Sequence, residues 1–483
     1  MTRTWTQPVA RVAAVGGLAA AVVLGADRLG SVSAGTSPAP TAERVAATSA
    51  TDYCPGDPFA ADGDDESPVE VTGSVSVQAA PDEVLDGVIT PPDEPGRVTL
   101  SSLSGPPSTA DEKPASGPTS ETSDELGDPV MARGTQERAP GLVSGQALLA
   151  GGEQASGLAA LPCTKPTADA WLIAGGGEKG RQEHLVVTNP GGNAVNARID
   201  VLGAKGDDTD RSVVVPAHGR SVVLLDGIGG TDDPQAVHVQ SAGGLVVPTI
   251  VDRHLDGLTP AGVETVSPTA EPANRQVLPA NVDGDERGMV IAAPGDSDAV
   301  VEIRRVGTGG SRGAKVVTVP AGEVVDVELP EVDGVHPWVV ESDEPVIAAA
   351  HLRSAGLGGE SDMSWSVATP AFATLGGVAL PAEVPSDVRR YLDVTADDGP
   401  AEAEVLIQRD GRISTEKVSL EEGHSTAMPV GAAEAVWVRP TSGSVHGAVL
   451  LIGREGVGRP RATSLPVLPL RVAMRDIDVV HQR

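Results

Sequence analysis

The most prominent chemical motif in this sequence is a glycine-rich run, Gly175-Gly176-Gly177-Glu178-Lys179-Gly180, which follows the apolar residues 171–174. Its G-x-G-x-x-G spacing is that of loops that hold a dinucleotide pyrophosphate at the N-terminus of the following helix. No helical pattern follows here, because residues 181–183 lead directly into the strand-like residues 185–188 and an Asn-Pro turn. We therefore predict a hairpin loop and no nucleotide cofactor.

A second motif, Gly309-Gly310-Ser311-Arg312-Gly313, has the G-x-S-x-G spacing of a hydrolase nucleophile elbow. That chemistry needs a strand-turn-helix that exposes the serine hydroxyl, together with a histidine and an acid. Here the motif joins two valine-rich segments, and His336 and His351 downstream are two of nine scattered histidines. The sequence favours a loop between strands.

The other polar residues form neither a metal signature nor a clear catalytic pair. His238 lies in an alternating segment and is expected on a strand face. Acid pairs such as Asp283/Asp285 and Asp296/Asp298 fall in predicted turns, where Asp hydrogen-bonds its own backbone. Glycosidases need two carboxylates across a cleft, which the sequence does not exclude. We predict no catalytic residue, no metal and no cofactor.

The chain has two cysteines, Cys54 and Cys163. In an exported protein they most simply form one disulfide. The bond would close a loop of roughly 110 residues, for which the chain-entropy model gives about 4–5 kcal/mol as an upper estimate. Two buried free thiols are the alternative. A metal site is disfavoured, because neither cysteine has a partner at ligand spacing.

The composition of the whole chain excludes several function classes. The 483 residues carry 67 acidic and 35 basic side chains, so the formal net charge of −32 opposes binding to nucleic acids and anionic lipids. Aromatic residues make up 2%, which leaves little material for stacking bases or sugars. The 58 glycines and 40 prolines oppose a helical bundle.

The N-terminus has the pattern of an export segment. Residues 12–26 form an uninterrupted run of apolar and small residues. As a helix this run would be about 22 Å long, shorter than a roughly 30 Å hydrocarbon core, which is typical of a signal peptide. Val32-Ser33-Ala34 has the form of a cleavage site, so cleavage near Ala34 and an uncleaved membrane anchor both stay open. In either case we expect residues 35–483 to be exported.

An internal repeat begins near residue 161. Residues 185–191 return as residues 289–295, and Trp338 returns as Trp437. The period of about 100 residues is too long for a solenoid and suits one β-sandwich per repeat. Short valine-rich segments between Gly, Pro, Asp and Asn predict antiparallel strands. Both tryptophans are expected to fill cores.

These patterns predict an all-β fold of tandem immunoglobulin-like antiparallel sandwiches, after an N-terminal segment and a partly disordered acidic region. Residues 104–140 contain almost no large apolar residue and are expected to form a disordered loop. Residues 51–160 could fold independently or complete the first repeat, and a Cys54–Cys163 bond favours the second. The expected segments are a signal peptide or anchor (1–34), a flexible tether (35–50), an irregular β region (51–160) and three repeats (161–277, 278–379 and 380–483).

The order of these segments resembles that of a known family. Tyr53-Cys54-Pro55-Gly56 follows one apolar segment and precedes an acidic Pro/Ser-rich stretch, and then come repeats with turns such as Asn189-Pro190-Gly191 and Val319-Pro320-Ala321-Gly322. This resembles an actinobacterial envelope family catalogued only as a domain of unknown function. The resemblance implies an exported or membrane-anchored protein and supplies no catalytic residues.

We therefore expect a non-enzymatic, exported cell-envelope protein that acts as a structural spacer or an accessory scaffold subunit. Its partner would be a membrane-embedded protein of envelope assembly or a cell-wall glycan. We expect no nucleic acid, and contact with the membrane only through the N-terminal segment. An envelope glycan-binding module is the second hypothesis, and an unrecognised hydrolase is the third.

Overall fold

The fold is almost entirely β, as predicted. The computed structural model describes residues 44–59, 69–104, 120–124, 126–204, 209–228, 233–355, 361–382, 384–453 and 460–475. The strand pairs of the larger sheets among these residues are antiparallel. Helix is confined there to α2 (Asp82–Leu85), η1 (Gln136–Arg138) and η2 (Leu225–Gly227). The predicted export segment lies outside the described residues.

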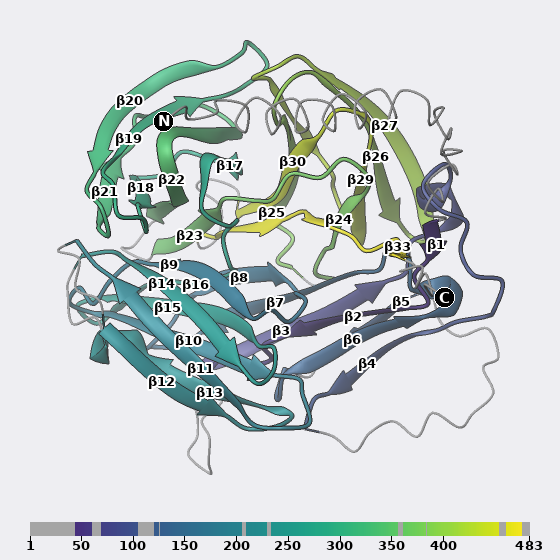
Figure 1. The fold of residues 1–483 in the computed structure, drawn as a ribbon, viewed down its shortest axis with the longest axis horizontal. Helices are drawn as coiled ribbons and strands as arrows, with labels where there is room; N and C mark the ends of the chain where they lie inside the picture. Colours follow the sequence, from purple (N-terminus) through teal and green to yellow (C-terminus); the bar gives the residue numbers. More distant parts are fainter. Residues whose placement is uncertain are drawn as a thin grey trace, which may run out of the picture. The chain divides into compact units, whose positions relative to one another are not determined.

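Contacts divide the chain into residues 1–45 with 475–483 and residues 46–474, and the sheets discussed below belong to the second unit. Two short strands, β1 (Arg44–Ala46) and β33 (Ala473–Arg475), cross the boundaries of this division. The strand β1 falls within the predicted flexible tether (35–50), so that prediction is wrong for these residues. The remaining strands form four sandwiches in chain order, and in the third a long strand joins both layers into one seven-stranded sheet (Figure 1).

The first sandwich contains two sheets, with orders β2-β6-β4 and β5-β3-β7-β8. Their strands pair only with one another within the described residues, so residues 51–160 do not complete the next sandwich. Val75 and Val77 of one sheet pack on the other sheet. The strands are β2 (Ser49–Cys54), β3 (Glu70–Gln78), β4 (Val98–Ser102), β5 (Ser120–Ser123), β6 (Val130–Thr135), β7 (Val143–Gly151) and β8 (Gly157–Pro162).

The prediction of a disordered loop over about 104–140 is wrong for much of this range. Residues 105–119 and 125 lie outside the described residues, but β5 and β6 lie within the range. β6 runs between β2 and β4 and buries Val130 and Ala132. Low hydrophobicity misled the prediction, because ladder pairing on both edges and a few small apolar residues suffice to order this strand.

The other three sandwiches share one strand order. The second has sheets β12-β11-β14-β9 and β13-β10-β15-β16, and the fourth has β27-β26-β29-β24-β32 and β28-β25-β30-β31. The strands of the second are β9 (Asp169–Ala174), β10 (Arg181–Asn189), β11 (Val195–Leu202), β12 (Thr209–Val215), β13 (Gly219–Leu224), β14 (Gln235–Ala242), β15 (Val247–Asp256) and β16 (Thr259–Val266). Those of the fourth are β24 (Gly376–Ala379), β25 (Val388–Ala396), β26 (Ala401–Arg409), β27 (Arg412–Leu420), β28 (Ser425–Pro429), β29 (Ala435–Ser442), β30 (Val445–Gly453), β31 (Ala462–Pro466) and β32 (Leu468–Pro469).

The third sandwich follows the same order but merges two strands into one. The sequence predicts separate strands near residues 338–341 and 346–350, whereas β22 (His336–Ala355) runs through both sheets. Its first half pairs with β17 and β19, and its second half pairs with β18 and β23. The other strands are β17 (Ala273–Asn281), β18 (Glu286–Ala292), β19 (Ala299–Arg305), β20 (Arg312–Val319), β21 (Val324–Glu328) and β23 (Ser361–Val367).

The expected repeat boundaries differ from those of the sheets by several residues. β8 extends to Pro162 in the first sandwich, β17 begins at Ala273, and β24 begins at Gly376. The strand order does not establish the immunoglobulin type. In that fold the first two strands share a sheet, whereas β9 and β10 lie in different sheets.

In each sandwich one edge strand contacts the corresponding edge strands of neighbouring sandwiches. β8 contacts β16, β16 contacts β23, β23 contacts β31, and β31 contacts β8. We call these four strands the hub. The fourth sandwich also packs on the first, where the indole Nε1 of Trp437 donates to the Gly141 carbonyl at 2.9 Å. The sandwiches of residues 46–474 are thus joined in a closed cycle.

Candidate functional site

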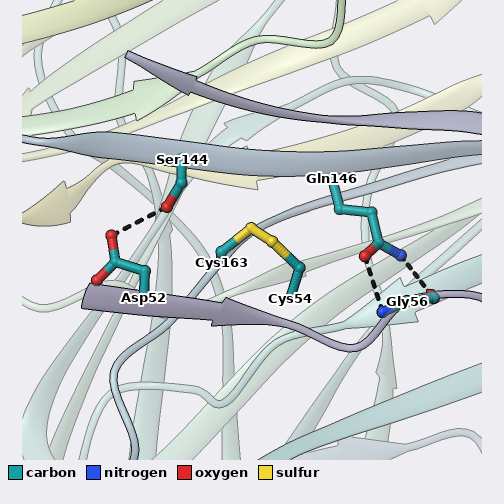
Figure 2. The surroundings of a disulfide bond; sticks show 6 residues. All are labelled: Asp52, Cys54, Gly56, Ser144, Gln146 and Cys163. Carbon is teal, nitrogen blue, oxygen red and sulfur yellow. Dashed lines mark hydrogen bonds between the residues drawn. A yellow bond between two sulfur atoms is a disulfide. The ribbon is translucent and has the colours of Figure 1, made fainter. Parts of the chain in front are cut away.

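The disulfide predicted from the sequence is present and joins the two sheets of the first sandwich. Cys54 ends β2, and Cys163 directly follows β8, with their Cα atoms 4.5 Å apart (Figure 2). Both cysteines are buried, 1% and 4% exposed. Next to the bond, the Tyr53 and Thr164 backbones exchange hydrogen bonds of 2.8 and 3.1 Å. The bond therefore locks an inter-sheet junction.

Polar side chains flank the disulfide on both sides, and they form hydrogen bonds with the backbone or with one another. The Gln146 amide donates to the Gly56 carbonyl at 2.7 Å and accepts from its N–H at 3.0 Å (Figure 2). Ser144 Oγ donates to the Asp52 carboxylate at 2.9 Å. Burial raises the pKa of Asp52, although Lys165 nearby opposes that shift. These groups serve the junction itself.

At the hub, one carboxylate accepts backbone hydrogen bonds from all four strands. Asp362 Oδ2 accepts from Leu158 of β8 at 3.1 Å and from Ala462 of β31 at 3.2 Å. Asp362 Oδ1 accepts from Met363 of β23 at 2.9 Å and from Val263 of β16 at 3.4 Å. The side chain is completely buried, and desolvation raises its pKa to about 8 despite the four amides. Asp362 therefore ties four sandwiches together.

A second buried acid extends the hub. Glu264 Oε1 accepts from the Thr463 hydroxyl at 3.0 Å, and this hydroxyl in turn accepts from the Ala160 N–H at 3.0 Å. Burial raises the pKa of Glu264 well above its ordinary value, and the nearby Asp362 carboxyl adds a smaller shift in the same direction. Both hub acids are thus held by amides and a hydroxyl.

The glycine-rich motif forms a loop between β9 and β10, as predicted, and its amides bind a side chain of this chain. Gly175 and Gly176 donate to the two oxygens of Glu183, at 2.5 and 3.0 Å. Glu183 is completely buried, and desolvation together with Asp252 raises its pKa to about 8. The anion cradle that a nucleotide would need is already filled by this carboxylate.

Arg181 joins Glu183 to a second buried acid. Its Nε and Nη2 donate to the two Asp252 oxygens, at 2.9 and 2.5 Å, and its Nε lies 3.7 Å from Glu183. Asp252 also accepts from the Trp365 indole at 2.8 Å. We call Arg181, Glu183 and Asp252 the Arg181 cluster. Two carboxylates share one guanidinium there, so a proton on Glu183 completes the charge balance.

The serine motif lies in the β19–β20 loop, as expected for a segment between strands. No helix follows it, since β20 begins at Arg312. His424 of the fourth sandwich lies near Gly310, but its Nδ1 faces the Glu422 carbonyl at 3.0 Å and its Nε2 lies 3.9 Å from Glu421. Within the described contacts no hydrogen bond joins Ser311 to His424.

The other singled-out residues have structural partners. Trp338 and Trp437 are buried, as predicted for core filling. His238 stacks on Trp171 with ring centroids 4.0 Å apart and bonds Asp169 at 3.0 Å. Among the turn acids, Asp285 accepts from the Ala355 N–H at 2.6 Å and Asp298 from the Ala321 N–H at 2.9 Å. The part of the chain that the structure describes contains no cluster of three metal-ligating side chains.

A family model described as "Family of unknown function (DUF5719)" matches residues 118–431. The chain belongs to this family. No curated protein matches it. A solved structure titled "Crystal structure of tetra-tandem repeat in extending region of large adhesion protein" matches at 13% identity and a TM-score of 0.11, covering 79% of this chain and 93% of that chain. A TM-score this low carries no argument.

Membership in DUF5719 identifies no site, so the candidates rest on geometry alone. Within the described residues, no helix is long and apolar enough to cross a membrane. Sequence reasoning missed Asp362, although a signal existed. Its partners Leu158, Val263 and Ala462 lie 204, 99 and 100 residues away, near multiples of the repeat period.

Proposed function

We propose that this DUF5719 protein is a non-enzymatic, exported component of the cell envelope that acts as a spacer or accessory scaffold for an envelope-assembly partner. The observation that carries the proposal is the hub, where Asp362 accepts amides from strands of four sandwiches. Strands tied to one carboxylate cannot shift independently. A body of this kind suits the presentation of loops and sheet edges at fixed spacing.

The use made of the buried acids supports a non-enzymatic role. Asp52, Glu183, Asp252 and Asp362 are all bound to hydroxyl, amide or guanidinium groups of the chain itself. A catalytic carboxylate must reach a reacting atom of the substrate. All four are at most 8% exposed, and burial raises the pKa of Asp52, Glu183 and Asp362.

The disulfide supports the exported location. Disulfides persist in oxidising compartments and are rare where cellular reductants keep thiols reduced. Thiol labelling of the native protein in intact cells tests this part. We expect no labelling of Cys54 or Cys163 before reduction, and labelling of both in folded protein would contradict export.

Purification from detergent-solubilised membranes after in-cell crosslinking tests the partner. We expect a stoichiometric membrane protein of envelope assembly with the wild type and with Asp333→Asn, a matched change at an exposed loop position, and its loss with Asp362→Asn. Mass spectrometry of the N-terminus in the same sample separates a retained anchor from cleavage near Ala34. A hydrolase or transferase activity lost in one single-residue variant would overturn the proposal.

A further inference from the structure

A polar cavity of about 320 Å³ lies between the second and third sandwiches. Arg181 and Glu178 line it on the side of the second sandwich. Asp326 of β21, His351 of β22 and Trp365 of β23 line it on the side of the third. Its size lies at the lower end of small-molecule sites, and fits one or two sugar rings.

The polar side chains of the cavity occur as preformed pairs of a donor and an acidic group. Arg181 lies 3.3 Å from Glu178, and His351 Nε2 lies 3.1 Å from Asp326 Oδ1. Arg353 pairs with Glu286 at the same cavity. Glu178, Asp326 and Glu286 each keep more than a third of the side chain exposed. Donors and acceptors therefore lie side by side facing the cavity.

The wall of the cavity is fixed from behind. Asp252 accepts two hydrogen bonds from Arg181 and a third from the Trp365 indole. The Arg181 guanidinium lies 5.7 Å from the Trp365 ring centroid, and the His351 ring lies 5.2 Å from the same side chain. Side chains already held in place lose little entropy when a ligand binds.

This arrangement selects a neutral, hydroxyl-rich ligand. Three carboxylates and a net charge of −32 oppose an anion, while two arginines oppose a cation. A hydroxyl both donates and accepts, so neighbouring hydroxyls can bond to the two members of an ion pair together. We propose that this cavity binds a neutral saccharide through the His351–Asp326 and Arg353–Glu286 pairs. This inference goes beyond the scaffold role and does not depend on it.

Titration calorimetry of the full chain with neutral oligosaccharides of glucose, mannose, galactose and arabinose tests the proposal. Asp326→Asn removes one charge at the cavity. Gly288→Ala removes none, but its methyl would lie 2.4 Å from His351 Nε2 and 2.7 Å from Asp326 Oδ1, so it must displace the pair. Glu302→Gln and Gly295→Ala are the matched controls, because Glu302 pairs with Arg304 and a Cβ at Gly295 has open space.

We expect saturable binding of at least one neutral oligosaccharide, weakened about tenfold or more by each cavity variant and unchanged by each control. Melting temperatures of the variants show whether they fold. If Gly288→Ala does not fold, Asp326→Asn alone still tests the proposal. Absence of binding at roughly millimolar oligosaccharide would overturn the inference. So would tighter binding of uronic-acid or amino-sugar oligosaccharides, or wild-type affinity in both cavity variants.

Discussion

The hub and the Arg181 cluster both bury two carboxylates, but they stabilise them in different ways. In the hub, Asp362 and Glu264 are held by backbone amides and a threonine hydroxyl. In the Arg181 cluster, Glu183 and Asp252 share one guanidinium. Backbone amides hold a carboxyl group through directional hydrogen bonds, whereas a guanidinium donates hydrogen bonds and also supplies the opposite charge. The two sites should therefore respond differently to the loss of a charge.

Removing the guanidinium should cause the largest loss of stability. Arg181→Met keeps the alkyl chain but leaves two acids, both completely buried, without their cation. We expect the free energy of unfolding to fall by about 3–5 kcal/mol. Arg304→Met is the control, since its partners Glu302 and Glu341 are more than a third exposed and should contribute at most about 1 kcal/mol. Equal losses in urea unfolding would mean that the buried cluster contributes no more to stability than an exposed ion pair.

A change at the hub should cost somewhat less. Asp362→Asn places an amide NH₂ against two N–H donors, so two hydrogen bonds are lost and their donors stay buried. We expect a loss of about 2–4 kcal/mol, because each unsatisfied buried donor costs 1–3 kcal/mol. Asp333→Asn, at an exposed position, should leave the urea midpoint unchanged. A stable Asp362→Asn protein would show that the four sandwiches hold together without this carboxylate.

Each of the two sites contains an acid that makes stability depend on pH. Asp362 and Glu183 keep their protons up to a pH of about 8 in the folded state, whereas the unfolded chain loses them near pH 4. The folded state therefore binds more protons between these values, and stability should fall as the pH rises from 5 to 8.

Asp362→Asn removes one of the groups that bind an extra proton in the folded state. The decrease of stability with pH should therefore become shallower by up to about 1.4 kcal/mol per pH unit. Denaturation series at several pH values measure the slope. Stability that rises across the same window would mean that the hub acid is charged in the folded protein.

The hydroxyl that links the hub acids should have the smallest effect. Thr463→Val keeps the shape of the side chain but removes the acceptor of the Ala160 N–H. We expect a loss of about 1 kcal/mol. Thr441→Val provides the exposed counterpart, because its hydroxyl donates to the Glu402 carbonyl at the surface. If Thr463→Val destabilises the protein no more than Thr441→Val does, the Thr463 hydroxyl does not contribute to the stability of the hub.

Local patterns predicted the fold class and several individual residues. Branched side chains between turn residues identified the strands. The two cysteines identified the disulfide, because neither has a partner at metal-ligand spacing. The positions of Trp338 and Trp437 followed from the repeat. The β strands of residues 120–135 were missed, because their order comes from pairing with distant strands and not from their own hydrophobicity.

The buried acids could not be identified from local sequence. Asp362 lies in Ser361-Asp362-Met363-Ser364-Trp365, which resembles a solvated strand with one apolar face. Its burial depends on strands that are about 100 and 200 residues away, at distances set by the repeat. Likewise, the run Gly175–Gly180 showed a loop whose amides could bind an acidic group, but not that the Glu183 carboxyl group occupies it.

The spread of the Asp362 partners along the chain also sets an order of events during folding. Leu158 and Ala462 lie on opposite sides of Asp362 in the sequence, more than 300 residues apart. A chain that emerges from its N-terminus can build three sandwiches before residue 462 is present, but the carboxylate then lacks the last strand that covers it. Such long-range closure is slow and entropically costly. Final burial of this acid thus acts as a completion step, reached only when the whole repeat array has left the ribosome.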